Sequence, residues 1–411
     1  MSKPKVLITG FGYVFSEPPS RNTMLSFLDF GYKVSVIHLK KHSQEQSFSL
    51  EENIETEFVY PKVLKKIRVL KNILEWISYK KQLNRWISSN PGAIVWVVHF
   101  TAVAAINFKM AKKKKCFTVC NVVDIPLTKH AGNFDRWINK KGWRKIRDCD
   151  LTVSSDSFKA DLAKMMGNLE KAPLVCHNCP RLSEFDEVQL SANKWLRNEL
   201  IRQGASITFD SAFILLRAGA IGELGGIEET IDAMQYLPKH FIFLMMGRPE
   251  KEFELKINAL IKQKDLAKRV FLWVRPSDEI WKKTLLGADV GHLVHIKSTS
   301  GPYKEMYELN SSLSNNRLFQ YMAAGIPIVS YEDSRMDSIY NEIHGFCKLS
   351  IQNIFIDTQK VLLNLAADKE YRLRLGTNNR QAFLKKYNWE NQFKPVYEEI
   401  ISENSYNLTA S

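Results

Sequence analysis

The segment from residue 314 to residue 329 carries the side chains best suited to binding an anion. Its sequence, SNNRLFQYMAAGIPIV, predicts a polar loop, a helix that begins near Asn316 and ends at Gly325, and a buried strand. The free N–H groups of a helix N-terminus attract anions, and an arginine in the first turn adds a charged donor. We therefore expect Arg317 to suit a diphosphate and Gln320, one turn on, to reach a ribose hydroxyl. By shape alone the segment also fits a well-capped helix that only packs.

Two candidates for acid–base chemistry lie in the first half of the chain. His99 follows an apolar run over 93–98, and Asp124 follows a second run that begins at Cys116. The carboxyl ends of parallel strands meet at one edge of a sheet, where ligands bind. Taken by itself, a histidine at the end of such a run fits a core residue that bonds to the backbone.

Short apolar runs that alternate with helix-length segments must position these groups. In the first half we expect strands over 5–9, 33–39, 57–60, 93–98, 116–119 and 151–154. The pattern repeats after residue 205, with strands over 212–216, 241–246, 269–273, 290–294 and 326–330. Strands of this kind predict parallel sheets covered on both faces, the doubly wound α/β arrangement. Two such domains place a cleft between them.

The segment from residue 314 to residue 329 resembles the "(P)NK-hydrophobic-FEYMAAG-(hydrophobic)-P" signature of GT-B-fold glycosyltransferases, particularly the retaining family 4 group. Looser similarities follow in the same order along nearly the whole chain. They lie at 18–37, 97–99, 120–124, 176–180, 215–226, 244–248, 270–273 and 387–390. The order of these pieces, more than any one of them, makes the resemblance specific.

The resemblance implies two Rossmann-like domains that face a central cleft. We expect an acceptor-binding domain over 1–180, a linker over 181–210 and a donor-binding domain over 211–389, with 390–411 packing back on the first domain. The implied activity is transfer of a sugar from a nucleotide-diphosphate donor to a lipid-linked or polysaccharide acceptor in cell-surface glycan synthesis. The expected outcome is retaining, without a metal or another cofactor.

The resemblance also assigns residues to roles. His99 would lie near the sugar, and Asp124 would face the acceptor and would serve as the base if the reaction were inverting. In a retaining transfer the leaving phosphate can take the proton, so positioning and electrostatics carry the catalysis. The residues expected to bind the donor are Gly12, Gly219, Gly247, Arg248, Trp273, Asn316, Arg317 and Gln320.

Three positions depart from the family pattern. Gln320 and Ser312 stand where the family has carboxylates, and the loop over 222–226 reads GELGG, without the usual basic residue. Arg317, Arg248 or Arg217 could supply the missing charge to the donor phosphates. The alternatives are a catalytically decayed GT-B-like binding or scaffolding protein and, as a lesser one, a nucleotide-sugar epimerase.

The charge of the chain is concentrated in one half. The net charge is +14, and residues 1–180 carry 29 Lys and Arg against 15 Asp and Glu, so residues 181–411 are neutral overall. In a helix predicted over 62–87, basic residues gather on one face around Trp76; they are Lys62, Lys65, Lys66 and Lys80. Lysines that flank an exposed indole suit an anionic bilayer surface. The alternative is a solvated lysine face with Trp76 packed on a neighbour, and without a nucleic-acid module we expect no nucleic-acid partner.

Composition sets the remaining expectations. The 411 residues, 45% of them hydrophobic and 25% charged, predict a globular protein of two or three domains and exclude wholesale disorder. No window reaches the roughly 20 apolar residues of a spanning helix. The six cysteines are scattered, and Cys176 and Cys179 have no second Cys-x-x-Cys pair with which to hold zinc. We expect a cytoplasmic protein, with any membrane contact peripheral on the inner face.

Overall fold

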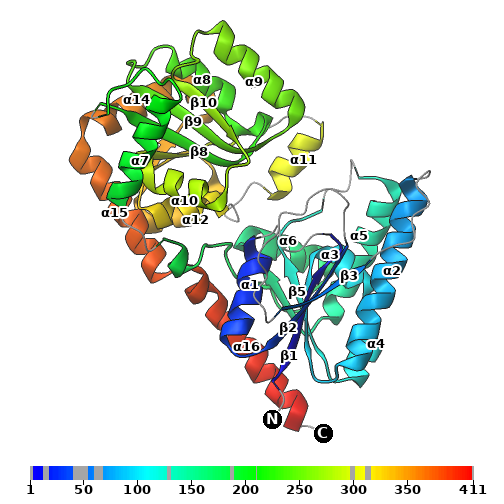
Figure 1. Ribbon diagram of the computed structural model, residues 1–411. Coiled ribbons are helices and arrows are strands. Elements are labelled where there is room, and N and C mark those ends of the chain that lie inside the picture. Colours follow the sequence, from blue (N-terminus) through cyan, green and yellow to red (C-terminus); the bar gives the residue numbers. More distant parts are fainter. Residues whose placement is uncertain are drawn as a thin grey trace. The chain divides into compact units, whose positions relative to one another are not determined.

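The chain divides into two compact units. Unit 1 comprises Met1–Asn178, Glu308–Ser314 and Trp389–Ser411, and unit 2 comprises Cys179–Tyr307 and Asn315–Asn388. The computed structural model describes residues 3–12, 18–39, 54–59, 68–126, 131–185, 189–209, 211–296, 301–310 and 316–409. Each unit contains one parallel sheet with helices packed on it (Figure 1).

Unit 1 is built on a seven-stranded sheet in the order β3-β2-β1-β4-β5-β6-β7. Its strands are β1 (Lys5–Gly10), β2 (Lys33–Leu39), β3 (Ile54–Val59), β4 (Ile94–Val98), β5 (Phe117–Val122), β6 (Leu151–Ser154) and β7 (Leu174–Val175). All neighbouring pairs are parallel. A strand covered on both faces reads as a continuous apolar run, and β4, IVWVV, is buried at every residue.

The helices of unit 1 cover both faces of this sheet. They are α1 (Pro18–Asp29), α2 (Arg68–Ser89), α3 (His99–Ala105), α4 (Phe108–Lys113), α5 (Asn133–Lys145), α6 (Ser157–Gly167) and α16 (Trp389–Thr409). Alternate strand residues belong to two hydrophobic cores. Val95 and Val97 pack in the core that holds residues of α2, α3 and α5, whereas Trp96 packs in the core that holds residues of α1 and α16. The two-residue period of the strand thus separates the two faces.

The C-terminal helix α16 returns to unit 1. Its first residue, Trp389, is buried and donates its indole N–H to Ser26 Oγ of α1 at 2.8 Å. Phe393 follows one turn later and packs edge-on against Phe27 of α1, with ring centroids 5.7 Å apart. Figure 1 shows this helix, in red, beside α1. The predicted return of the last helix to the first domain is confirmed.

Unit 2 has a six-stranded parallel sheet in the order β10-β9-β8-β11-β12-β13. Its strands are β8 (Phe213–Ile221), β9 (Phe241–Pro249), β10 (Val270–Val274), β11 (Val290–Leu293), β12 (Ile328–Tyr331) and β13 (Phe346–Leu349). Its helices are α7 (Gln189–Arg202), α8 (Ile227–Met234), α9 (Lys251–Gln263), α10 (Asp278–Gly287), α12 (Asn316–Ala324), α13 (Asp337–Ile343), α14 (Ile354–Ala367) and α15 (Lys369–Lys385). The predicted α/β class with two parallel sheets is confirmed.

Two parts of unit 2 differ from the sequence expectations. The segment expected as a linker carries α7, which packs along α10 and belongs to unit 2, because Leu196 and Leu200 give it a fully buried apolar side. Arg197 strengthens this packing through a bond to Asp289 at 2.8 Å. Helix α11 (Gly301–Asn310) was not expected from the sequence, and the division between the units falls within it.

None of the described helices combines the length and the apolar character that a membrane crossing needs.

Gly247 is essential to the pairing of β8 with β9. It lies opposite Gly219, and a Cβ atom on it would come within 1.8 Å of the Gly219 carbonyl oxygen. We predict that Gly247→Ala lowers the free energy of unfolding by about 2–4 kcal/mol, because the backbone of one strand would have to shift. Chemical denaturation monitored by circular dichroism measures this.

Gly204→Ala is the matched control for Gly247→Ala. Gly204 also has a positive φ, +90°, but open space surrounds the position of its Cβ. Gly204→Ala should therefore lower the free energy of unfolding only by the cost of the left-handed backbone conformation, about 1 kcal/mol. Equal losses for the two variants would contradict the proposed clash.

Candidate functional site

Helix α12 places the anion-binding candidates of unit 2. It begins at Asn316, as the sequence predicts, and Gly325 follows it with a φ of +67°. Arg317 in the first turn is only 6% exposed, whereas Asn316 and Gln320 are half-buried. The guanidinium in the first turn of α12 is therefore buried in the protein and is not carried by a surface side chain.

Arg317 lies against Gly219 of the strand β8. A Cβ atom on Gly219 would come within 3.0 Å of Arg317 Nη2, and Gly219 has a φ of +113°. Arg317 Nη2 also donates to the Ala220 carbonyl oxygen at 3.4 Å. Gly219 pairs with Gly247 of β9, so the structure brings three of the predicted donor-binding residues together at one point. The missing side chain of Gly219 makes room for the guanidinium, and that of Gly247 allows the backbone of β8 to approach β9.

Tyr321 anchors α12 on the same strand. Its hydroxyl accepts from the Ala218 N–H at 2.9 Å and donates to the Leu216 carbonyl oxygen at 2.8 Å. Its ring fills the space above Gly291, where a Cβ atom would come within 2.5 Å. Because Tyr321 lies one turn after Arg317, these bonds fix the position of the guanidinium relative to β8.

Arg217 braces the glycine-rich loop that lacks a basic residue. Arg217 Nη1 donates to the carbonyl oxygens of Gly225 at 2.9 Å and Val294 at 3.0 Å, and it lies 3.1 Å from His292 Nδ1. Arg217 is 2% exposed. Of the three arginines considered as substitutes for the loop cation, Arg217 therefore supports the loop from inside instead of lying open to a ligand.

His292 continues this network as a neutral imidazole. Its Nδ1 accepts from Arg217, so its Nε2 carries the proton and donates to Thr230 Oγ1 at 2.9 Å. The Thr230 hydroxyl in turn donates to the Gly226 carbonyl oxygen at 2.6 Å. Burial and the charges of Arg217 and Arg317 hold the pKa of His292 well below its usual range. Two carbonyls of the loop are thereby fixed by one buried chain of hydrogen bonds.

The interior groups around Arg317 create a positive potential. Burial and the charge of Arg317 hold the pKa of Arg217 well below its usual range. Burial, together with Arg317, Arg217 and Arg335, likewise lowers the pKa of His295, just past the end of β11. Burial makes the largest contribution to both shifts, and the neighbouring arginines add to it. An anion bound among them would relieve the repulsion between the arginines.

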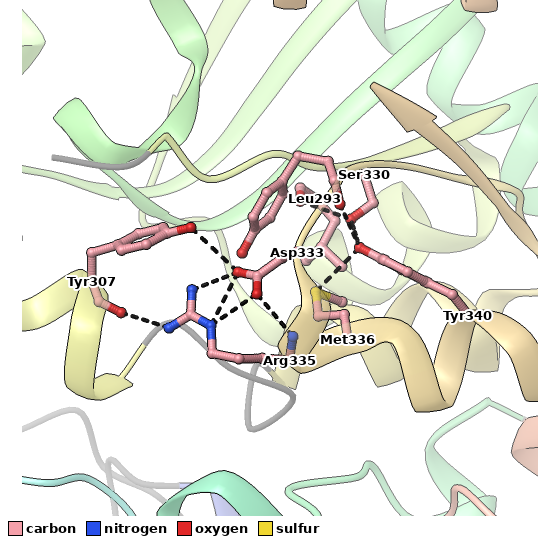
Figure 2. Close-up of polar contacts among 8 residues, drawn as sticks. Leu293, Tyr307, Ser330, Asp333, Arg335, Met336 and Tyr340 are labelled. Carbon is pink, nitrogen blue, oxygen red and sulfur yellow. Dashed lines mark hydrogen bonds and ion pairs between the residues drawn. The ribbon is translucent and has the colours of Figure 1, made fainter. Parts of the chain in front are cut away.

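A third arginine is held at the end of β12 (Figure 2). Arg335 donates through Nε to Asp333 Oδ1 at 2.9 Å and through Nη1 to the Tyr307 carbonyl oxygen at 3.0 Å. The Tyr307 hydroxyl donates to Asp333 Oδ2 at 3.3 Å. Although burial alone would raise the pKa of Asp333, the bonds from Arg335 hold it below its usual range. The Asp333 carboxylate therefore forms an ion pair with Arg335.

The loop after β12 is tied down on its other side as well. The Tyr340 hydroxyl donates to the Tyr331 carbonyl oxygen at 2.9 Å. It also lies 2.6 Å from Ser330 Oγ. Figure 2 shows Tyr340 directed toward Ser330. The sequence analysis did not single out Asp333, Arg335 or His295. These residues could have been proposed from the sequence because they lie within five residues of the ends of predicted strands, and ligands bind at the edge where the ends of parallel strands meet.

Of the remaining predicted donor residues, Arg248 directly follows Gly247 on β9 and pairs with Ala220 of β8. Arg248 is exposed. Trp273 donates its indole N–H to Gln203 Oε1 at 2.8 Å and packs edge-on against Trp195 of α7, so its recorded contacts in the described part of the chain do not reach Arg317. Gly12 belongs to unit 1 and has open space around it. Ser312 lies outside the described residues.

In unit 1, His99 and Asp124 occupy the carboxyl edge of the sheet. His99 directly follows β4 and has a φ of +67°, a left-handed conformation that costs an ordinary residue about 1–2 kcal/mol. Asp124 lies two residues beyond β5, and its side chain is 61% exposed. Lys159 Nζ, fully buried, lies 2.7 Å from Asp124 Oδ1. The sequence analysis missed Lys159, because nothing local marks a lysine of α6 as buried.

The ionisation of Asp124 is set by these neighbours. Partial desolvation of the carboxyl group would by itself raise the pKa of Asp124, but the charge and hydrogen bond of Lys159, with a contribution from His99, bring it below its usual value. Asp124 is therefore a carboxylate at neutral pH, and the charge of His99 acts on it.

The basic face of α2 differs from the sequence expectation. Lys62, Lys65 and Lys66 lie outside the described residues. Trp76 is buried, so of the two alternatives the exposed indole is wrong and the packing of Trp76 on a neighbour is confirmed. The reason is α5, which packs on α2: Trp76 meets the ring of Trp137 at 5.5 Å. Lys80 and Lys141 lie over the Trp76 ring at 5.5 and 5.2 Å. The exposed indole of this face is Trp137, at 52%.

Metal-binding groups do not gather in the part of the chain that the structure describes: no three His, Cys, Asp or Glu side chains there could share an ion. All six cysteines are free thiols, Cys176 and Cys179 among them.

Comparison with known proteins gives structural matches alone. No family profile matches the sequence, and no curated protein matches it.

Solved structures match over nearly the whole chain. HepE of Anabaena, solved in complex with UDP, matches with a TM-score of 0.71 at 12% identity, covering 97% of this chain and 100% of that one. A sucrose-phosphate synthase of Thermosynechococcus elongatus matches with a TM-score of 0.70 at 15% identity, covering 98% and 100%. A glycosyltransferase of Rickettsia africae matches with a TM-score of 0.72 at 13% identity, covering 98% and 99%. The chain therefore has the two-domain GT-B fold of these glycosyltransferases.

Proposed function

We propose that this protein is a glycosyltransferase that takes a sugar from a nucleotide-diphosphate donor. The observation that carries the proposal is the buried guanidinium of Arg317, at the N-terminus of α12 and against Gly219. A helix N-terminus and an arginine fork both favour a phosphate, and glycine lets a ligand approach the backbone closely. The GT-B fold supplies the context in which this arrangement binds a nucleotide sugar.

The cations of unit 2 support a diphosphate as the ligand. Burial and the charge of Arg317 lower the pKa of Arg217, so the protein keeps two neighbouring guanidinium groups where water is largely excluded. Such an arrangement is costly unless an anion compensates for it. Arg317 thus replaces the basic residue that the loop over 222–226 lacks.

UDP-glucose is the first donor to test. HepE of Anabaena has been solved with UDP, with UDP and glucose, and with UDP-glucose. Asn316 and Gln320 lie on the same helix as Arg317 and would meet the ribose and the phosphates. An amide such as Gln320 both donates and accepts, so it can bind a ribose hydroxyl in place of a carboxylate.

We further propose that the acceptor is lipid-linked or a polysaccharide and that the transfer serves cell-surface glycan synthesis. The transfer would retain the configuration of the sugar. The protein would work peripherally at an anionic membrane, on its cytoplasmic side. The surplus positive charge of residues 1–180 favours an anionic partner for this half. The reaction needs no metal or other cofactor in this scheme.

Helix α5 offers the surface for that contact. Trp137, Lys140 and Arg144 are exposed and line one hollow together with Lys141. Burial and the charge of Lys80 lower the pKa of Lys141, so like charges are crowded here. An indole amid basic side chains fits the headgroup region of an anionic bilayer.

Arg317→Gln tests donor binding. We predict that it weakens UDP-glucose binding by about tenfold or more, because a charge-assisted bidentate contact is lost. Isothermal titration calorimetry measures the affinity, and Arg374→Gln, an exposed arginine of the same unit, is the matched control. The proposal fails if both variants bind like the wild type, or if the wild type binds none of the UDP-, GDP-, ADP- and dTDP-sugars.

Gln320→Glu separates an active site from a decayed one. We predict that it lowers turnover of UDP-glucose by roughly tenfold, because a carboxylate three residues after Arg317 would pair with the guanidinium and compete with the diphosphate. Gln320→Ala shows what the amide itself contributes. Turnover that rises in the glutamate variant would instead indicate a decayed binding or scaffolding protein, and NMR of the sugar pool would reveal an epimerase.

Neutralising α5 tests membrane contact. We predict that the triple variant Trp137→Ser, Lys140→Gln, Arg144→Gln binds phosphatidylglycerol-containing vesicles at least about tenfold more weakly, since each basic residue near an anionic surface contributes about 1 kcal/mol. Vesicle co-sedimentation measures this, with phosphatidylcholine vesicles as the uncharged reference. Lys251→Gln with Lys262→Gln, two exposed lysines of α9, is the control. Equal binding by all three proteins would contradict the assignment.

A further inference from the structure

Lys159 is a lysine without exposed surface beneath the edge of the unit 1 sheet. It lies in the first turn of α6, where its backbone N–H donates to Oδ1 of Asp156, the residue before the helix, at 2.8 Å. Its ammonium group donates to the Val123 carbonyl oxygen and to Asp124 Oδ1, both at 2.7 Å. A lysine is rarely buried to this extent unless it is paired.

The backbone that carries Asp124 is held at the same place. The Val123 carbonyl oxygen accepts from Lys159 Nζ and also from Ser155 Oγ at 2.9 Å. The Ser155 carbonyl oxygen lies 3.1 Å from His177 Nδ1. Lys159 therefore contacts both the peptide before Asp124 and the carboxylate itself, which fixes the direction of that side chain.

The charges that face Asp124 are both basic. Lys159 approaches from α6 and His99 from the start of α3. A buried ammonium favours an ionised partner, because an unpaired charge in the interior is costly. The rest of the Asp124 side chain is exposed, so the carboxylate can still meet a ligand.

We propose that Lys159 is a positioning residue that keeps Asp124 an oriented, ionised carboxylate, so that Asp124 binds a sugar hydroxyl as a hydrogen-bond acceptor and is not the general base. This rests on the proposed glycosyltransferase function. A carboxylate stabilised in its charged form is a weak base at neutral pH, and the Brønsted relation makes it inefficient at taking a proton. The same charge makes it a strong acceptor for a neutral hydroxyl.

The ionisation of Asp124 can be measured without substrate. In protein labelled with carboxyl-¹³C aspartate, the Asp124 signal is identified by its loss in Asp124→Asn. We expect it to remain that of a carboxylate from neutral pH down to the ordinary aspartate range, about pH 4. Lys159→Met should bring protonation to higher pH, Lys159→Arg should keep the wild-type behaviour, and Lys164→Met, an exposed lysine of the same helix, is the control.

Two results in that titration would overturn the proposal. One is an Asp124 signal that titrates above the ordinary aspartate range in the wild type, a result that does not depend on the Lys159 variants. The other is an unchanged titration in a folded Lys159→Met protein, because the lysine would then be only a structural residue.

Kinetics with UDP-glucose tests the role in binding. We expect Asp124→Asn and Lys159→Met to raise the KM for UDP-glucose by roughly tenfold while kcat changes much less. This is the pattern that loss of a hydrogen bond to the bound sugar produces. A fall confined to kcat, with loss of the acid limb of the pH–rate profile, would make Asp124 the base and refute the proposal. If the wild type neither binds nor turns over UDP-glucose or the other nucleotide sugars, the proposed function fails, and the titration still decides the claim about Lys159.

Discussion

Positive charge held inside unit 2 is the constraint on which the rest of the candidate site depends. Arg317 and Arg217 are almost fully buried, and each needs the fold to accommodate it. Gly219 leaves room for the Arg317 guanidinium, and Tyr321 fixes α12 on β8 through two hydrogen bonds. Arg217 is bonded to carbonyls of the loop and of β11's end. Burying cations in this way costs stability, and binding of a phosphate would offset that cost.

The two units present edges of opposite character. At the end of the unit 1 sheet, Lys159 and His99 favour an ionised Asp124, which is suited to a neutral hydroxyl. In unit 2 the side chains at the strand ends are arginines and histidines, and the acid among them, Asp333, is bonded to Arg335. One edge thus suits the hydroxyls of a sugar and the other suits phosphates, which is the pair of chemistries that the proposed transfer requires.

Periodicity and order predicted most of the architecture but only part of the site. Apolar runs predicted most of the strands, and the start of α12 at Asn316 followed from its polar loop and glycine end. The two-residue β7 and the short β13 are too brief for such a pattern. Lys159, Asp333 and Arg335 were missed because their roles come from contacts that the sequence does not encode locally. The exposure of Trp76 stayed open for the same reason: a helical wheel shows a face but not the helix that covers it.

The most direct test of the central claim is the structure of the protein in crystals soaked with UDP. The account predicts that the pyrophosphate lies at the N-terminus of α12, within hydrogen-bond distance of the Arg317 guanidinium and beside Gly219, while Arg217 keeps its bonds to the loop carbonyls. A pyrophosphate bound elsewhere, for example on the exposed Arg248 with Arg317 uninvolved, would contradict it.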